Sequence, residues 1–138
     1  MLQFKEEIKE IPCCPPVTAV GRTQTVWRWV MDPLTTDSFL PVALKNPPRL
    51  HDVKDAQEKC SCWGLSMHGS YEQSIGAFKH LERSFKMARK RIANSVASAT
   101  ITPDHGLCTD LDKYGHFDLH PYATAQLHQT FVIAGLIP

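Results

Sequence analysis

The sequence predicts an α+β fold, a mixed or antiparallel sheet with one long amphipathic helix at about residues 71–93 packed on one face. Segments rich in β-branched and aromatic residues lie on both sides of a single helical pattern, and they do not alternate regularly with further helices. The 138 residues, 43% of them hydrophobic, suit a single α+β domain spanning residues 1–138 and are too few for two independent cores.

The first third of this domain is expected to be rich in loops. Its prolines are Pro12, Pro15, Pro16, Pro33, Pro41, Pro47 and Pro48. Each proline removes a backbone donor and favours extended geometry in the residue before it. We therefore expect short strands joined by turns, with a short amphipathic helix at residues 2–10 and an extended segment at residues 38–44.

Four segments have the composition or the alternation of strands. Residues 25–31 are dense in β-branched and aromatic side chains, and residues 96–102 form a second β-branched stretch. Residues 115–120 alternate polar and apolar side chains, as a half-buried strand does. A shorter extended candidate spans residues 62–68.

The strongest helical pattern runs from about Tyr71 to Ala93. Ser70 and Gln73 match a capping box, and apolar residues then recur every three or four positions, as on the buried face of a helix. These apolar residues are Ile75, Phe78, Leu81, Phe85, Ala88 and Ile92. This helix should lie across one face of the sheet.

The tail at residues 123–137 fits two alternatives. It forms either a helix through Gln129 followed by a strand at residues 131–134, or one helix that ends at Gly135. The apolar run at residues 131–137 is far shorter than the roughly 20 residues of a membrane span. If exposed, that run would provide a homodimer surface.

Charge is balanced over the whole chain but not along it. The net charge of +1 argues against a wholesale polyanion binder. On one helix, however, four basic residues would align in a stripe beside the apolar face, namely Lys79, Arg83, Lys86 and Lys90. Such a stripe either binds phosphate groups or is simply a solvated helix face near the C-terminal end.

His116, Asp118 and His120 would share one face of a strand. A metal would need a further ligand from elsewhere, because the outer histidines would stand about 13 Å apart at Cα. Candidates for that ligand are His68, His105 and Cys108. Alternatively, Asp118 orients a histidine for acid–base chemistry, or the three residues form the exposed side of an edge strand.

The five cysteines are expected to be buried thiols. The first residues contain two acids and no apolar stretch like that of a secretory signal, so we expect a cytoplasmic location and no disulfide framework. The pairs Cys13-Cys14 and Cys60-x-Cys62 do not have the spacing of zinc knuckles. We therefore expect no metal and no cofactor.

Arg28 has Val26 and Val30 as its neighbours on one strand face. If that face is buried, Arg28 needs a carboxylate or a ligand phosphate; if it is the outer face, the side chain can extend over the valines to water. An early-strand arginine followed by a later-strand serine, Ser66, resembles the residue order of ADP-ribosyltransferase-type folds. Those enzymes generally place a glutamate on a late strand, and no glutamate follows Glu82, so the chain is not assigned to that family.

Two functional hypotheses follow. The first is a non-catalytic binding module for a partner protein or an anionic, phosphate-bearing ligand, which uses the basic stripe and Arg28. The alternative is a small enzyme or ligand-processing domain, with or without a metal, whose pocket combines Arg28, Ser66 and the triplet His116, Asp118 and His120. The chain contains neither a glycine-rich phosphate loop nor a serine-hydrolase elbow.

Overall fold

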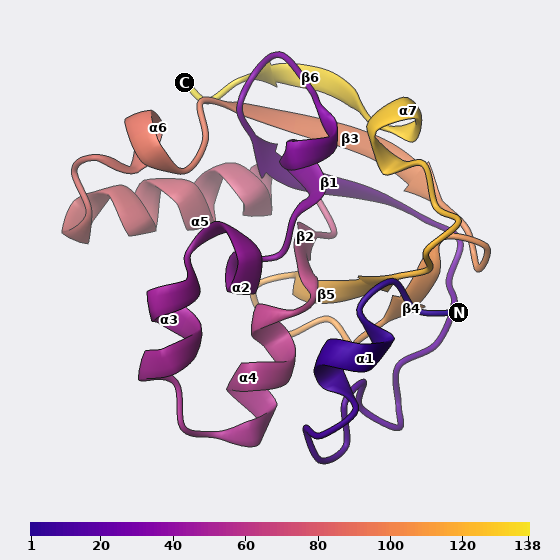
Figure 1. Cartoon of the computed structure of the whole chain (residues 1–138). Coiled ribbons are helices and arrows are strands. Elements are labelled where there is room, and N and C mark those ends of the chain that lie inside the picture. Colours follow the sequence, from indigo (N-terminus) through magenta and orange to yellow (C-terminus); the bar gives the residue numbers. More distant parts are fainter.

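Six strands form one antiparallel sheet in the order β4-β5-β2-β1-β3-β6 in the computed structural model, which describes all 138 residues (Figure 1). The strands are β1 (Gln24–Val30), β2 (Leu65–His68), β3 (Ser95–Ile101), β4 (Gly106–Cys108), β5 (His116–Pro121) and β6 (Val132–Leu136). Every neighbouring pair is antiparallel. The predicted α+β class with an antiparallel sheet is confirmed.

The first third contains more helix than the prolines suggest. The helices of the chain are α1 (Lys5–Ile8), the 3-10 helix η1 (Thr36–Phe39), α2 (Val42–Lys45), α3 (Pro47–Asp52), α4 (Ala56–Cys62), α5 (Tyr71–Ser84), α6 (Ala88–Arg91) and α7 (Leu127–Thr130). The extended segment expected at residues 38–44 is therefore wrong. Pro47 and Pro48 lie in the first turn of α3, where a backbone N–H has no intrahelical partner to lose.

Helix α5 begins as predicted but ends early. The Ser70 side chain caps it by accepting a hydrogen bond from the backbone N–H of Gln73. The helix stops at Ser84 because Phe85 is extended, and the short α6 follows. A straight helix to Ala93 would carry the chain about 13 Å further along its axis. The turn instead places Phe85 against the apolar cluster that contains Phe78 and returns the chain to β3.

The sheet divides between β1 and β2. Strand β1 pairs with β3 along its whole length, but with β2 it pairs only at Trp27 and His68. The two halves, β4-β5-β2 and β1-β3-β6, therefore diverge from this one point (Figure 1).

The apolar core lies on both faces of the sheet. One cluster, which includes Val26, Leu65 and Phe117, occupies one face. Helix α5 covers part of the opposite face, where Phe78 packs with Val96. A third cluster joins α1, α2 and the end of α4; its buried members are Phe4, Ile8, Ala43, Val53, Cys62 and Trp63. The part of this same face that lies on β2 and β5 is polar, and it carries the candidate site.

The tail follows the first of its two alternatives, a short helix and then a strand. Helix α7 ends at Thr130 and β6 forms one edge of the sheet, with Val132 and Leu136 exposed. None of the helices combines the length and the apolar character needed to cross a lipid bilayer.

Candidate active site between strands β2 and β5

The register between β2 and β5 gathers four polar side chains on one face. Ser66 pairs with Asp118, and His68 pairs with His116. Their neighbours along both strands are buried in the apolar cluster on the opposite face; these are Leu65, Met67, Phe117 and Leu119. Because side chains alternate along a strand, burying these apolar residues places the polar ones together.

Ser66 and His116 are in hydrogen-bond contact across the two strands. The Ser66 Oγ lies 2.7 Å from the His116 Nε2. On the other side of the imidazole ring, the His116 Nδ1 lies 3.9 Å from the Asp112 Oδ2. The order of groups is therefore hydroxyl, imidazole, carboxylate, which is the order used to activate a serine nucleophile.

Asp112 is held beside His116 by the backbone. Its Oδ1 accepts hydrogen bonds from the backbone N–H groups of Tyr114, at 2.8 Å, and His116, at 3.0 Å. Desolvation raises the pKa of this carboxyl, but these hydrogen bonds and the charge of His116 outweigh it and hold the pKa below its ordinary value. In the tautomer with its proton on Nδ1, the nitrogen that faces Asp112, His116 has Nε2 free to accept a hydrogen bond from the Ser66 hydroxyl.

Asp118 supplies a second carboxylate near the same imidazole. Its Oδ1 lies 3.8 Å from the His116 Nε2, and its Oδ2 accepts a hydrogen bond of 2.7 Å from the Ser61 Oγ on α4. The Asp118 side chain is only 13% exposed. Through Ser61, helix α4 thus fixes the orientation of this carboxylate on β5.

His68 forms the closed side of the site. It is 3% exposed, and its ring lies 5.5 Å from that of His116 and 5.6 Å from that of Trp29. Burial and the neighbouring His116 lower the pKa of His68 to about 4, against partial opposition from Asp112. His68 is consequently neutral at pH 7, and its buried Nδ1 has no hydrogen-bond partner.

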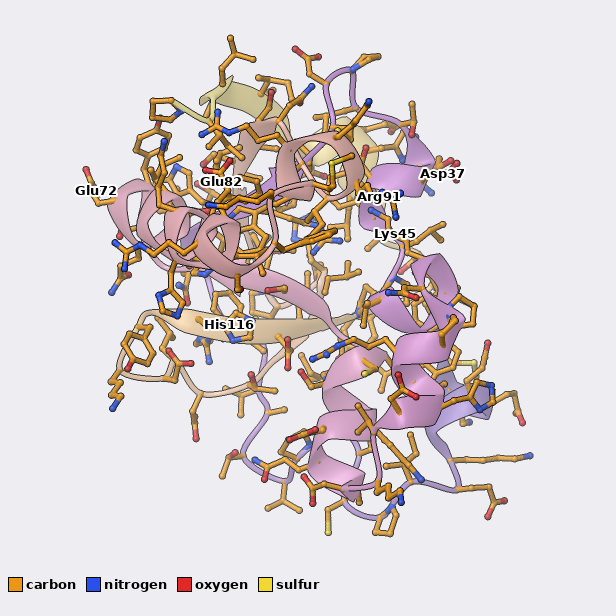
Figure 2. The ribbon with its side chains drawn as sticks, turned by 90° about the vertical axis from the view of Figure 1, so that its left-hand side faces the viewer. Asp37, Lys45, Glu72, Glu82, Arg91 and His116 are labelled. Atoms are coloured by element: carbon orange, nitrogen blue, oxygen red, sulfur yellow. A yellow bond between two sulfur atoms is a disulfide. The ribbon has the colours of Figure 1, made fainter.

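A cavity of about 330 Å³ opens beside His116. Its lining includes four acidic residues, Glu58, Asp110, Asp112 and Asp118, and no lysine or arginine. Figure 2 shows His116 below α5, the helix that bears Glu72 and Glu82. The cavity is thus a place where a neutral or cationic group can approach His116.

Arg28 is buried, and backbone carbonyl groups surround it. Its guanidinium donates to the carbonyl oxygens of Ser66 at 2.9 Å, Ser38 at 3.2 Å and Leu40 at 3.4 Å. The expectation that a buried Arg28 pairs with a carboxylate or a phosphate is therefore wrong. Burial lowers its pKa to about 10, partly offset by Asp118, so it stays charged at pH 7. Arg28 bridges the gap where β1 and β2 diverge and holds the backbone of Ser66.

The basic residues predicted to share one helix face do not do so. Lys79 and Arg83 lie on α5, Lys86 lies in the turn after it, and Lys90 lies on α6. Lys79 donates to the Pro138 carbonyl. The prediction of one continuous stripe is wrong because the chain turns at Phe85.

Arg89 is also occupied within the chain. It pairs with Glu82 at 2.6 Å and donates to the carbonyl oxygens of Ile137 and Pro138. The cationic side chains that remain exposed around the α5–α6 turn are Arg83, Lys86, Lys90 and Arg91.

Two cysteines form a disulfide, contrary to the expectation of buried thiols only. The bond joins Cys14 to Cys60, while Cys62 and Cys108 are free and buried and Cys13 is free and exposed. The sequence gives no sign of this pairing, because 46 positions separate the two residues and each lies in a different short cysteine pair.

His120 does not join His116 and Asp118 in one site. It is 3% exposed, and its Nε2 lies 3.9 Å from the Cys60 Sγ. Burial lowers the pKa of His120, with partial opposition from Asp118. The set of side chains that could hold a metal is Cys14, Cys60 and His120, and it includes neither His116 nor Asp118 nor the expected additional ligands His68, His105 and Cys108.

Comparisons of the chain with protein-family models, curated proteins and solved structures found no significant match. The functional proposals below therefore rest on the geometry of the chain alone.

Proposed function

We propose that the protein is a small enzyme in which the Ser66 hydroxyl is the nucleophile and His116 is its general base. The observation that supports this proposal is the 2.7 Å separation between the Ser66 Oγ and the His116 Nε2. His116, though not Ser66, also lines the cavity described above. A serine hydroxyl is a weak nucleophile by itself, and an imidazole within hydrogen-bond distance can remove its proton as it attacks.

The two carboxylates around His116 have different roles in this proposal. Asp112 faces Nδ1 and stabilises the imidazolium that forms when His116 takes the Ser66 proton. Asp118 lies near Nε2, and the hydrogen bond from the Ser61 hydroxyl restricts the rotation of its carboxylate. The acidic lining of the cavity favours a neutral or cationic substrate over an anionic one.

A fluorophosphonate ester tests the proposal without a known substrate. An activated serine Oγ attacks the phosphorus of this ester and fluoride leaves. The phosphonyl group that remains on the serine adds a fixed mass to the chain. We expect one adduct per wild-type chain, mapped to Ser66 by peptide mass spectrometry, and none in S66A. The control is S98A, because Ser98 is also a strand serine whose hydroxyl is hydrogen-bonded, at 3.0 Å to the Val26 carbonyl. An unlabelled wild type, or equal labelling of S66A, would refute the nucleophile.

The second candidate function is the binding of an anionic ligand such as a nucleotide. It is favoured by the four cations that remain exposed around the α5–α6 turn, which are Arg83, Lys86, Lys90 and Arg91. Arg28 and Ser66 also follow the residue order that resembles ADP-ribosyltransferase-type folds, but the Arg28 guanidinium is bonded to backbone carbonyl groups and takes no part in this candidate. Those enzymes generally place a glutamate on a late strand, whereas the only acidic residue on β5 is Asp118 and β6 has none. We therefore propose that such a ligand is bound without transfer of a group from it.

Calorimetric titration with NAD, ADP and inorganic phosphate tests this candidate. Binding through phosphate groups should weaken as the salt concentration rises, and it should weaken in R83Q/K86Q/K90Q. The charge-matched control is K5Q/K9Q/K54Q, which also removes three positive charges, at exposed lysines outside the α5–α6 turn. Heats that are indistinguishable from dilution with all three probes would reject the second candidate.

A cytoplasmic location stays a prediction, and the disulfide opposes it. Disulfides persist mainly in oxidising compartments. Trapping the free thiols in freshly lysed cells and counting the labelled cysteines by mass decides the matter: three labelled cysteines indicate the disulfide form and five indicate a reducing location.

A homodimer through the C-terminal run also stays a prediction. Strand β6 is a sheet edge, so its outer backbone groups can pair with β6 of a second copy, next to the exposed Val132 and Leu136. Light scattering should give twice the chain mass of 15.5 kDa for the wild type and the monomer mass for V132K. A monomeric wild type at high concentration would contradict the prediction.

A further inference from the structure

We propose that reduction of the Cys14–Cys60 disulfide creates a binding site for a zinc-class divalent ion, with Cys14, Cys60 and His120 as its ligands. The two Sγ atoms and one imidazole nitrogen lie within 4.8 Å of one another. This site is separate from the Ser66–His116 pair, so it does not depend on the proposed function.

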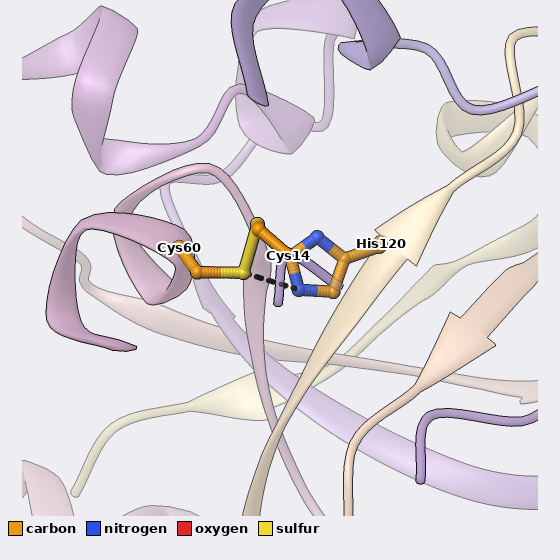
Figure 3. Close-up of side chains that lie close together, drawn as sticks. All are labelled: Cys14, Cys60 and His120. Carbon is orange, nitrogen blue, oxygen red and sulfur yellow. Dashed lines mark hydrogen bonds between the residues drawn. A yellow bond between two sulfur atoms is a disulfide. The ribbon is translucent and has the colours of Figure 1, made fainter. Parts of the chain in front are cut away.

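Three elements that are distant in the sequence bring these ligands together. Cys14 lies in the loop before β1, Cys60 lies on α4, and His120 lies on β5. Figure 3 shows the His120 ring directed at the disulfide, with Nε2 facing the Cys60 Sγ. Cys60 and His120 are both 3% exposed, so a bound ion would be largely shielded from solvent.

The donor set and its spacing match a tetrahedral zinc site. Thiolate sulfur and imidazole nitrogen are the ligands that zinc prefers, at about 2.3 Å and 2.0–2.1 Å. Ligand atoms around such an ion stand roughly 3.3–3.8 Å apart. The two sulfur atoms of the opened disulfide must move apart to this spacing, and the longest donor separation, at most 4.8 Å, must shorten by about one ångström. Side-chain rotation at a freed Cys14 can provide both movements.

The surrounding packing holds the ligands in place once the disulfide is open. Cys14 packs against the apolar cluster that contains Phe4 and Trp63, and α4 is capped at Asp55, whose side chain accepts from the Glu58 N–H. His120 lies on a strand that is paired on both sides. Both Cys60 and His120 also line the cavity, so a fourth ligand, a water, can reach the ion from that side.

The chemistry balances with a dithiol as the reductant. The dithiol gives two electrons and two protons to the Cys14–Cys60 bond and becomes a disulfide itself. Binding of the ion then releases the two thiol protons, while neutral His120 contributes its lone pair. Because the disulfide and the ion use the same two sulfur atoms, each form excludes the other.

Cobalt(II) is the probe for this site, because thiolate ligands give it intense charge-transfer absorption and a tetrahedral site gives it strong visible bands. The full-length chain is reduced with a phosphine, which becomes a phosphine oxide and does not retain the metal. We expect one cobalt per reduced chain with both sets of bands, and no such spectrum from the oxidised chain. Added zinc should bleach the spectrum.

Matched variants separate this site from unspecific binding to thiols. C14S and H120Q should each weaken cobalt binding at least about tenfold, because loss of even an indirect partner of a metal commonly costs that much. C13S is the control, since Cys13 is the exposed neighbour of Cys14 and lies outside the ligand set. C14S removes a half-buried loop residue, so it remains decisive if H120Q fails to fold.

Three results would overturn the site. The first is a reduced wild type without the cobalt spectrum. The second is an equal loss of binding in C13S and C14S, which would point to unspecific thiols. The third is an unchanged spectrum in a folded H120Q, which would remove the histidine from the ligand set.

Discussion

The Ser66 Oγ on β2 lies 2.7 Å from the His116 Nε2 on β5, although 50 residues separate the two in the sequence. The contact is a consequence of strand register. Ser66 pairs with Asp118 and His68 pairs with His116, so all four side chains leave the same face while their apolar neighbours fill the other. A shift of either strand by one residue would bury the polar groups and expose the core.

Replacing Gly106 and Gly76 with alanine should change the free energy of unfolding in opposite directions. Gly106 has φ +154°, and a Cβ there would collide with the carbonyl oxygen of His120 in the neighbouring strand. We expect G106A to lower the free energy of unfolding by about 3 kcal/mol, in the range of backbone strain and overpacking. G76A should raise it by roughly 0.5–1 kcal/mol, because Gly76 lies within helix α5 with nothing near its Cβ position.

Urea denaturation of the two variants and the wild type measures both effects. Equal stability of G106A and the wild type would contradict the tight approach between β4 and β5. A loss of stability in G76A would contradict the open space beside α5.

Opening the Cys14–Cys60 disulfide should destabilise the fold in the absence of metal. The bond closes a loop of 46 positions, and the loop-entropy relation gives about 4 kcal/mol for that length. Urea unfolding of the oxidised wild type and of C14S/C60S should differ by an amount of this order. C13S should match the wild type, and equal stability of the oxidised chain and the double variant would show that the bond does not constrain the unfolded chain.

The fold should lose stability as the pH falls from about 6.5 towards 4. The pKa of His68 is lowered from 6.5 to about 4 in the folded chain, so the unfolded chain binds the proton first. The contribution of neutral His68 is complete above pH 6.5 and is lost progressively within this window. His120, whose pKa is also lowered by burial, acts in the same direction.

Unfolding measured in urea at pH 7, 6, 5 and 4.5 tests this dependence. H68Q should show a shallower decline than the wild type, and H51Q, which changes an exposed histidine on α3, should leave the slope unchanged. An identical slope in H68Q and the wild type would rule out His68 as the titrating group.

The parts of the fold that were predicted correctly are those with a local signal. The strand at residues 25–31 and the start of α5 at Tyr71 follow from β-branched composition and from the Ser70 cap. The end of α5 has no such signal, because apolar spacing continues past Phe85. The helix ends where Phe85 packs against the apolar cluster that contains Phe78 and where the chain returns to β3, and both are tertiary effects.

The candidate site was predicted in part. Ser66, His116 and Asp118 were named from the sequence, and the pairing of β2 with β5 brings them together. Asp112 was not predicted to be a site residue, although it lies four residues before His116, in the turn that leads into β5. His120 was grouped with His116 because the two alternate along one strand. In the structure His120 instead contacts Cys60 of the disulfide on α4. No local sequence pattern indicates a contact between residues 60 positions apart.

The rate of phosphonylation of Ser66 measures the role of His116 most directly. We predict that H116N reduces the second-order rate constant for the fluorophosphonate at least about 100-fold, in the range of general-base contributions, while H51N leaves it unchanged. Circular dichroism confirms that the variant is folded. A folded H116N that reacts at Ser66 as fast as the wild type would contradict the proposal that this imidazole activates the hydroxyl.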